Sequence, residues 1–447
     1  MGLLDTLYTG ASGLSAASAG IDATANNVAN ATTEGYQRRS VVQGTSDPIV
    51  RGGLSIGTGV SVHNIVREGD ALLGMQQLSQ AGEASTAATL HDELAAVEGV
   101  FDESSSTGPR STLDQFFDAL TAVSSDPSDP GLRAEVVRAG ENLAESIQQA
   151  AEQLQKTQEA QEEAVSVKLP PLNAKLQEVA SLNQRIVAAG GEAEAADLVE
   201  QRERLMRELS EDAGFTARVE ASGAATVMLD GHAVVTGEEA RTLSSGGGMR
   251  IELSVDDGTV GVDPGGSIGG LIEAHAAIDG WLTELDTFAL DFATAVNGQN
   301  AAGFVSGGAA GGDLFTVDPG DPRNSLSFTA GIDDLALAGL ATAEAGDGQN
   351  VEGLLALQSA AIVGGATPGD HLSGVTDLVA GDVSSAAARA DNEQLVLGDL
   401  DMLASQRFGV DMDVEATSLI VYQTAYQAAA RVISTANETL GTLMELV

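Results

Sequence analysis

The chain has 447 residues and carries 65 acidic side chains against 21 lysines and arginines, which gives a formal net charge of -44. A surface this acidic repels nucleic acid and anionic lipid, because both need clustered Lys and Arg, so we expect no nucleic-acid partner. The sequence has no cysteine, which excludes disulfides and thiol chemistry, and no apolar stretch long enough to predict membrane insertion.

A heptad repeat marks the first predicted helix, which spans about residues 3 to 29. Its apolar side chains recur every seven residues and are Leu7, Leu14, Ile21 and Val28. This spacing is typical of a coiled-coil seam. Asn30 and Gly35 are available to end the helix, because both tolerate the left-handed backbone of a helix terminus. A connector with short strands is predicted from there to residue 67.

Amphipathic helices are predicted after the connector, because apolar residues between positions 90 and 123 recur at the spacing of one helix face. Asp129 before Pro130 predicts the start of a long helix. Pro170 and Pro171 predict that this helix breaks or kinks sharply, since neither residue offers a backbone donor.

Glycines and a change of period mark the next elements. Gly190 and Gly214 predict the ends of two further helices. Apolar residues alternate with a period of two between positions 215 and 262, which predicts a small β region. Residues 301–350 are rich in Gly, Ala and Asp and contain two short strand candidates, and helical character resumes near residue 351.

A second heptad ends the chain. It consists of Leu419, Tyr426, Ile433, Leu440 and Val447, interleaved with Tyr422, Ala429, Ala436 and Leu443. A heptad helix cannot bury its stripe alone. The two terminal helices can pair with each other and present their other faces to neighbouring copies. The alternative is a helical hairpin that packs only on its own domain.

These elements predict a mainly α fold with a smaller β insertion, in which the N- and C-terminal helices pair as a coiled coil beside a central helical bundle and an outer β region. We expect a terminal assembly domain from residues 1–67 and 405–447. The helical middle domain is predicted to comprise residues 68–214, 266–300 and 351–404. The β-rich outer insertion is predicted at residues 215–265 and 301–350.

Candidate catalytic and metal-binding patterns are weak. Ser267 lies between Gly265 and Gly269 in a G-x-S-x-G pattern, but strands alternating with helices are not predicted upstream, so a tight strand-to-helix corner is preferred over a hydrolase nucleophile. The histidines are not at metal-ligand spacing, and Asp413 and Glu415 are predicted to favour a helix N-terminus by their charge. We therefore expect no catalytic residue, no cofactor and no metal.

Two terminal segments resemble a known group of proteins. Residues 26–39 read NNVANATTEGYQRR and residues 422–437 read YQTAYQAAARVISTAN. Both are similar to the ends of bacterial flagellar axial proteins, the rod, hook and first hook-associated proteins. Residues 57–67, 197–209 and 266–272 resemble interior segments of the same group. The motif residues that carry the terminal resemblance are Asn26, Asn27, Asn30, Gly35, Tyr36, Gln423, Arg431 and Asn437.

The C-terminal pattern is most similar to the family of the first hook-associated protein. That resemblance implies a structural component that polymerises at the distal end of the hook and forms the junction with the filament. It implies assembly through both terminal heptads, with copies of itself, the hook protein and the next hook-associated protein as partners, and an export chaperone at the C-terminal helix. It also implies an extracellular location in the flagellum, reached by type III export without a cleaved signal peptide.

Two alternatives stay open at this point. A flagellar hook or rod protein would have a mostly β interior, whereas this chain is predicted to be helical directly after its first connector. A secreted serine hydrolase, an alternative of another class, would have an activity that depends on Ser267.

Overall fold

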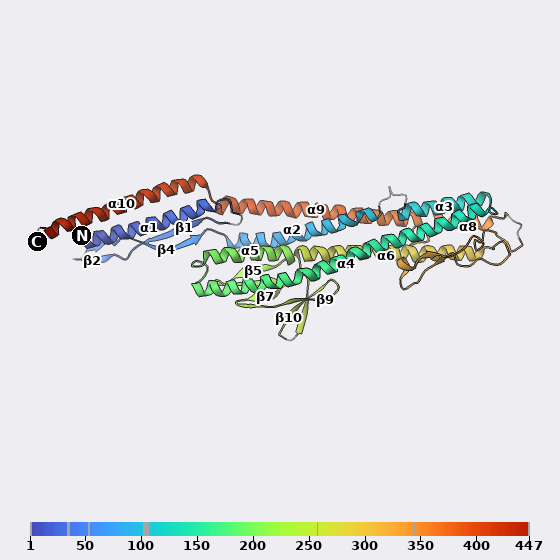
Figure 1. The fold of residues 1–447 in the computed structure, drawn as a ribbon, viewed down its shortest axis with the longest axis horizontal. Coiled ribbons are helices and arrows are strands. Elements are labelled where there is room, and N and C mark those ends of the chain that lie inside the picture. The colour runs from blue at the N-terminus through green and yellow to red at the C-terminus, as the bar shows by residue number, and fades with distance from the viewer. Residues whose placement is uncertain are drawn as a thin grey trace.

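The computed structural model describes residues 2–33, 36–51, 54–101, 107–256, 258–342 and 346–445. The chain forms an elongated rod in which the long helices lie roughly along one axis, and both termini lie at the same end (Figure 1). The helices are α1 (Leu3–Ala29), α2 (Ala71–Val97), η1 (Glu98–Phe101), α3 (Pro109–Ser125), α4 (Pro130–Ala189), α5 (Ala196–Ala213), α6 (Gly266–Ala302), α7 (Pro322–Ser325), α8 (Gln349–Ala356), η2 (Leu357–Ser359), α9 (Pro368–Phe408) and α10 (Met412–Glu445).

The strands are short and pair in antiparallel fashion. They are β1 (Arg39–Thr45), β2 (Ile49–Arg51), β3 (Leu54–Ile56), β4 (Val60–Arg67), β5 (Thr216–Val219), β6 (Ala225–Leu229), β7 (His232–Thr236), β8 (Glu239–Ala240), β9 (Leu243–Gly247), β10 (Arg250–Val255), β11 (Gly258–Val262), β12 (Phe315–Thr316) and β13 (Ser327–Phe328). Strands β5 to β8 form one sheet and β9 to β11 another. The predicted β region at residues 215–262 is confirmed, as is the predicted mainly α fold class with paired terminal helices.

Local signals in the sequence fix several helix ends as predicted. The Asp129 carboxylate accepts hydrogen bonds from the backbone N–H of Gly131 (2.6 Å) and Leu132 (3.3 Å), which caps α4. Gly190 ends α4 with φ of 110°, and Gly214 ends α5 with φ of 70°. Both glycines take the left-handed conformation that side chains with a Cβ disfavour, so these helix ends follow from the residue type.

The predicted break at Pro170 and Pro171 is wrong, because α4 is continuous from Pro130 to Ala189. Both prolines lie on the exposed face of the helix. The carbonyl groups that lose their helical partners there can be hydrated by solvent. The opposite face carries buried Leu169, Leu172 and Leu176 through the same turns. Continuous packing of that face outweighs the local cost of the prolines, which is about 3 kcal/mol for each.

Two apolar cores fill the body of the rod. The larger core joins α3, the first half of α4, α6, α8 and α9, and contains Trp281 and a group of phenylalanines. In it Phe116, Phe292 and Phe315 meet edge to face, with ring centroids 5.6 to 6.0 Å apart. The second core lies between the second half of α4, α5 and strands β5 to β11. Among the described residues, neither core includes any from 2–67 or 409–445.

Two asparagines at the end of α6 hold the segment of residues 301–350 against the helices. The Asn297 side-chain oxygen accepts from the backbone N–H of Leu314 (2.8 Å) and Phe315 (2.9 Å). The Asn300 oxygen, which is fully buried, accepts from the N–H of Ala336 (3.0 Å). These bonds satisfy backbone groups that no regular element pairs, and they place Leu314 and Phe315 in the larger core.

A buried arginine ties the α4/α5 hairpin to the sheet. Arg202 has no exposed side-chain surface, and its guanidinium donates to Asn183 Oδ1 (3.1 Å) and to the Gly223 carbonyl (2.6 Å) and pairs with Glu192. Asn183 also accepts from the backbone N–H of Ala225 (2.9 Å). One polar network therefore links both helices to the first strands of the sheet.

Replacing this arginine tests that network. Arg202→Met should lower the free energy of unfolding by about 3 kcal/mol, because it leaves buried acceptors without a donor. Urea unfolding followed by circular dichroism measures the change. Arg204→Met, two residues along on the exposed side of α5, serves as the control and should alter stability by less than about 0.5 kcal/mol. Equal stability of the two variants would contradict a structural role for Arg202.

Candidate assembly interface

The first and last helices lie antiparallel along each other. Gly10 of α1 lies beside Ile433 of α10, Gly13 lies beside Ala429, and Gly20 lies beside Tyr422. The residue numbers rise along one helix as they fall along the other, which defines the antiparallel direction. Figure 1 shows the pair as a separate arm at one end of the rod.

Small residues of α1 form the seam of this pair. A Cβ placed on Gly20 would lie 2.4 Å from the Tyr422 ring, and one placed on Gly10 would lie 2.8 Å from Ile433 Cγ1. The absence of a side chain at these glycines lets the larger residues of α10 pack against the α1 backbone. The neighbouring α1 residues Ala16 and Ala17 are buried as well.

The seam of α1 differs from the predicted one. The predicted side chains Leu7, Leu14 and Ile21 are half-buried and Val28 is exposed. Leu7 lies three residues before Gly10, and Leu14 and Ile21 directly follow Gly13 and Gly20, the glycines against which side chains of α10 pack. The stripe Leu7, Leu14, Ile21 and Val28 therefore flanks the seam.

On α10 the predicted heptad does face α1. Tyr422 and Ile433 contact its glycines. Leu419 and Leu440 are half-buried, and Tyr426 is 39% exposed. The side chain of Leu443 lies outside the described set, as does residue Val447.

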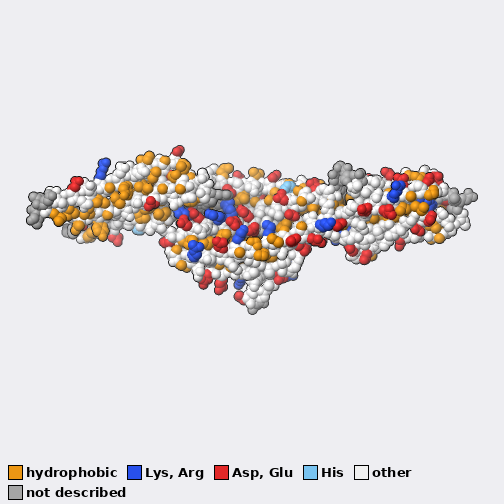
Figure 2. Space-filling model, viewed as in Figure 1, with side chains coloured by type: hydrophobic (Ala, Val, Ile, Leu, Met, Phe, Trp, Pro, Cys, Tyr) orange, Lys and Arg blue, Asp and Glu red, His pale blue; other side chains and the backbone are white. Residues whose placement is uncertain are grey.

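Apolar side chains gather on the outer surface of this pair. Leu4 and Tyr8 of α1 and Ile420, Val421 and Val432 of α10 are all exposed. Figure 2 shows hydrophobic side chains concentrated over this end of the molecule. Few charges interrupt them, since Asp5 and Asp22 are the charged residues of α1. We call this surface the apolar face. Exposed apolar area of this kind is typical of interaction surfaces.

A two-stranded ribbon runs beside α1 toward its first turn. Strands β1 and β4 pack on α1, where the Val60 N–H donates to Ser12 Oγ (3.3 Å) and the Gln43 amide lies 3.5 Å from the Ala16 carbonyl. Strands β2 and β3 continue the ribbon, and Ile49 and Val50 on them are exposed. The ribbon tip adds exposed apolar surface at the end that holds both termini (Figure 1).

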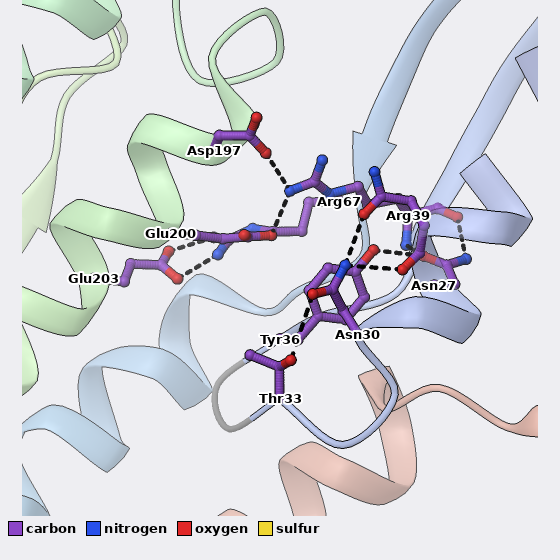
Figure 3. A network of polar contacts seen from close by, with 10 residues as sticks. Asn27, Asn30, Thr33, Tyr36, Arg39, Arg67, Asp197, Glu200 and Glu203 are labelled. Atoms are coloured by element: carbon purple, nitrogen blue, oxygen red, sulfur yellow. Dashed lines mark hydrogen bonds and ion pairs between the residues drawn. The ribbon is translucent and has the colours of Figure 1, made fainter. Parts of the chain in front are cut away.

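Asn27 organises the turn that follows α1. Its oxygen accepts from the Tyr36 hydroxyl and the Arg39 N–H, both at 2.9 Å. Its amide donates to the Arg39 carbonyl (2.9 Å) and to Glu415 (3.1 Å). Burial raises the pKa of Tyr36, which keeps the phenol in the protonated form that donates to Asn27. Figure 3 shows Asn27 and Tyr36 directed toward each other.

Glu415 joins the start of α10 to the same turn. Its carboxylate is 1% exposed and accepts from Arg38 Nε (2.6 Å). This hydrogen bond raises the pKa of the Arg38 guanidinium. The Asp411 carboxylate accepts from the N–H of Asp413 (2.9 Å), which caps α10. The charge of Glu415 predicts a place at the helix N-terminus, but no local pattern predicts its ion pair with Arg38, which lies 377 residues away.

Two arginines of the ribbon connect it to α5. Arg39 pairs with Asp197 (2.6 Å) and Glu200 (2.9 Å), and Arg67 pairs with Glu203. Burial alone would lower the pKa of Arg39, and the hydrogen bonds that it donates to its two acidic partners raise it. Figure 3 shows α5 presenting its three carboxylates to these guanidinium groups. The motif at residues 26–39 thus meets the motif at residues 197–209.

The other motif residues have simpler settings. Asn30 ends α1 with φ of -108°, which is not left-handed, and its amide donates to the Asn26 carbonyl (3.0 Å). Gly35 lies outside the described residues. Three further motif side chains are exposed on α10: Gln423, Arg431 and Asn437.

Ser267 has partners of a structural kind. The Lys168 ammonium donates to its hydroxyl (3.0 Å), and the hydroxyl lies 3.3 Å from the Asp212 carbonyl. Gly266 has φ of 60° and lies against the end of α5, as a tight corner requires. In the part of the chain that the structure describes, no group of His, Asp or Glu could hold a metal ion, and no helix is long and apolar enough to cross a membrane.

Comparisons with known proteins point to one family. Residues 94–315 match the flagellar hook-associated protein FlgK helical domain. Residues 405–446 match the C-terminal region of the flagellar basal body rod FlgEFG proteins, and residues 7–37 match the flagella basal body rod protein family. The last two matches cover α10 and α1, the helices that carry the apolar face.

Similar individual proteins agree with these matches. Flagellar hook-associated protein 1 of Bacillus subtilis is 28% identical, with 97% of this chain and 96% of that protein covered. The protein of the same name from Escherichia coli is 28% identical, with 74% of this chain and 63% of that protein covered. A solved structure of the flagellar hook junction protein FlgK from Burkholderia pseudomallei matches with a TM-score of 0.66 at 15% identity, covering 74% of this chain and 99% of the other.

The glycine seam gives a direct test of the helix pair. Gly20→Ala should destabilise the pair by about 1 to 3 kcal/mol, because the new methyl group overlaps the Tyr422 ring. Hydrogen exchange of the α1 and α10 amides should then quicken. Gly441→Ala is the control, since a Cβ there meets nothing within 4 Å. Adding Tyr422→Ala to Gly20→Ala should slow the exchange again, and equal exchange in all variants would contradict the seam.

Proposed function

The chain belongs to the FlgK family of flagellar hook-associated proteins, and from this we infer that it is a structural axial component of the bacterial flagellum at the hook-to-filament junction. We propose that it polymerises at the distal end of the hook, where its work is mechanical. It self-assembles with hook and hook-associated proteins, and we place the hook protein on one side and the next hook-associated protein on the filament side. No catalytic step and no cofactor are part of this function.

The proposed assembly mode rests on one observation: a chain of net charge -44 exposes an apolar face on its terminal helices. Copies of so acidic a protein repel one another over most of their surface. The apolar face is poor in charge and exposes Tyr8 and Ile420. Burying it between copies removes apolar area from water without bringing acidic groups together. We therefore propose that neighbouring copies meet through this face.

The proposed interface combines two kinds of residue. Those of α10 that face α1, Tyr422 and Ile433 among them, shape the pair, and the half-buried Leu7, Leu14 and Ile21 form its edge toward neighbouring copies. The interface predicted from the heptads is Leu7, Leu14, Ile21, Val28, Leu419, Tyr422, Tyr426, Ile433, Leu440 and Leu443. We add the exposed Ile420 and Val421, and Ile49 and Val50 on the ribbon tip.

The family resemblance implies the route to the flagellum. We propose export as an unfolded chain through the flagellar type III apparatus, without a cleaved signal peptide. An export chaperone would cover α10 before assembly, because exposed Ile420, Val421 and Val432 would otherwise favour aggregation. The acidic charge argues against a nucleic-acid partner.

The domain division stays a proposal. Residues 1–67 and 405–447 would form the assembly domain, and the remaining segments would form the helical middle domain and the outer insertion. A hook or rod protein, the alternative within the same group, is not favoured, because residues 94–315 match the FlgK helical domain. A secreted hydrolase is not favoured either, since the matching family model and the curated relatives are flagellar hook-associated proteins.

A charge on the apolar face should block assembly and leave folding intact. Ile420 is 63% exposed, so Ile420→Asp costs the folded monomer little. At an interface the same change loses the burial of a large side chain, about 1.5 to 3 kcal/mol, and adds a desolvation cost. Cells that carry Ile420→Asp should build hooks but shed filament subunits into the medium, which immunoblotting of the medium measures.

Leu340→Asp is the matched control, because Leu340 is also 63% exposed and lies in the segment of residues 301–350, away from the terminal helices. Cells with this variant should keep their filaments. Stable filaments with Ile420→Asp, in cells that export the protein, would remove the apolar face from the proposed interface.

A further inference from the structure

The terminal helices and the body of the rod share no apolar core. We call residues 2–67 and 411–445 the terminal unit and residues 70–408 the body. Among the described residues, every member of the apolar clusters belongs to the body. Two units without a common core are held in one orientation only by the polar contacts and chain crossings between them.

The chain passes twice between the terminal unit and the body, and each passage lies between two regular elements. Strand β4 ends at Arg67 and α2 begins at Ala71, and α9 ends at Phe408 and α10 begins at Met412. No continuous helix therefore runs through the joint. Backbone hydrogen bonds reach across it from the Arg38 N–H to the Phe408 carbonyl and from the Glu68 N–H to the Arg38 carbonyl, both at 2.9 Å. These bonds fix the point at which the terminal unit meets the body. The angle between the two units depends on other contacts.

Arginine and carboxylate pairs supply those contacts. Arg39 and Arg67 project from the ribbon of the terminal unit, and their partners lie one helical turn apart on α5, in the body (Figure 3). The side chains of Arg39 and Glu200 are 13% and 18% exposed, so their pair at 2.9 Å is largely shielded from solvent. Arg67 meets Glu203 through two hydrogen bonds, which fixes direction as well as distance.

We propose that Arg39 and Arg67 are positioning residues that set the angle between the terminal unit and the body. Their guanidinium groups bind successive carboxylates of α5, and these two side-chain attachments beside the crossing resist rotation about it. Breaking the pairs frees the angle. When neighbouring copies hold the terminal units, this joint sets how far each body tilts.

Distance measurements on the soluble full-length chain test this proposal. The chain has no cysteine, so Ser15→Cys on α1 and Glu178→Cys on α4 place two spin labels at defined, exposed positions. Double electron–electron resonance should give one narrow distance distribution. Combining Arg39→Glu with Arg67→Glu should shift and broaden this distance distribution.

Three controls separate positioning from folding. Arg389→Glu breaks ion pairs with Glu83 and Glu273 inside the body and should leave the distribution unchanged. Exchanging the charges of one pair, with Arg67→Glu and Glu203→Arg together, should narrow the distribution relative to Arg67→Glu alone. Fluorescence of Trp281, which is buried in the larger core, should be the same in every variant.

A distance distribution that stays narrow and unshifted in the Arg39→Glu, Arg67→Glu chain would overturn the proposal. A distribution in the unsubstituted chain that is as broad as in the doubly substituted chain would overturn it as well. If the charge reversal alters Trp281 fluorescence, the neutral variants Arg39→Gln and Arg67→Gln are measured instead, with the same two outcomes deciding.

Discussion

The close approach of α1 and α10 is the constraint on which the rest of the structure depends. Tyr422 and Ile433 of α10 pack against glycines of α1, so α10 supplies the large side chains at these contacts of the seam. The large apolar side chains of α1 are then left at the edge of the seam or outside it. The reverse arrangement, with those side chains inside, would leave an outer surface of small residues with little area to bury between copies.

The distribution of charge supports the same division. Most acidic groups stand on the body, whereas the apolar face has few. Three arginines lie at the joint, where Arg38, Arg39 and Arg67 each bind acidic partners. Asn27 and Glu415 bring the start of α10 to the end of α1 at the same place. One polar cluster therefore closes the terminal pair and attaches it to the body.

Much of the fold could be predicted from local signals, because a cap or a helix stop depends on neighbours in the sequence. Asp129 and Gly214 act where the sequence placed them. The uninterrupted passage of α4 through Pro170 could not be predicted, since it depends on which face of the helix a distant sheet covers. The seam of α1 could not be predicted from its heptad, because a heptad is recognised by large apolar side chains. The contact with α10 is made at glycines, which have no side chain. The pairing of Glu415 with Arg38 joins residues from opposite ends of the chain, and no local pattern announces it.

Accessibility of single cysteines tests the central claim most directly. Tyr8→Cys places a thiol on the apolar face, and Ala436→Cys places one in the buried seam. In the soluble chain, a maleimide should label the first rapidly and the second slowly. In purified flagella both should react slowly, because neighbouring copies cover the apolar face. Undiminished labelling of Tyr8→Cys in flagella would contradict the account, since the face would then remain open to solvent in the assembly.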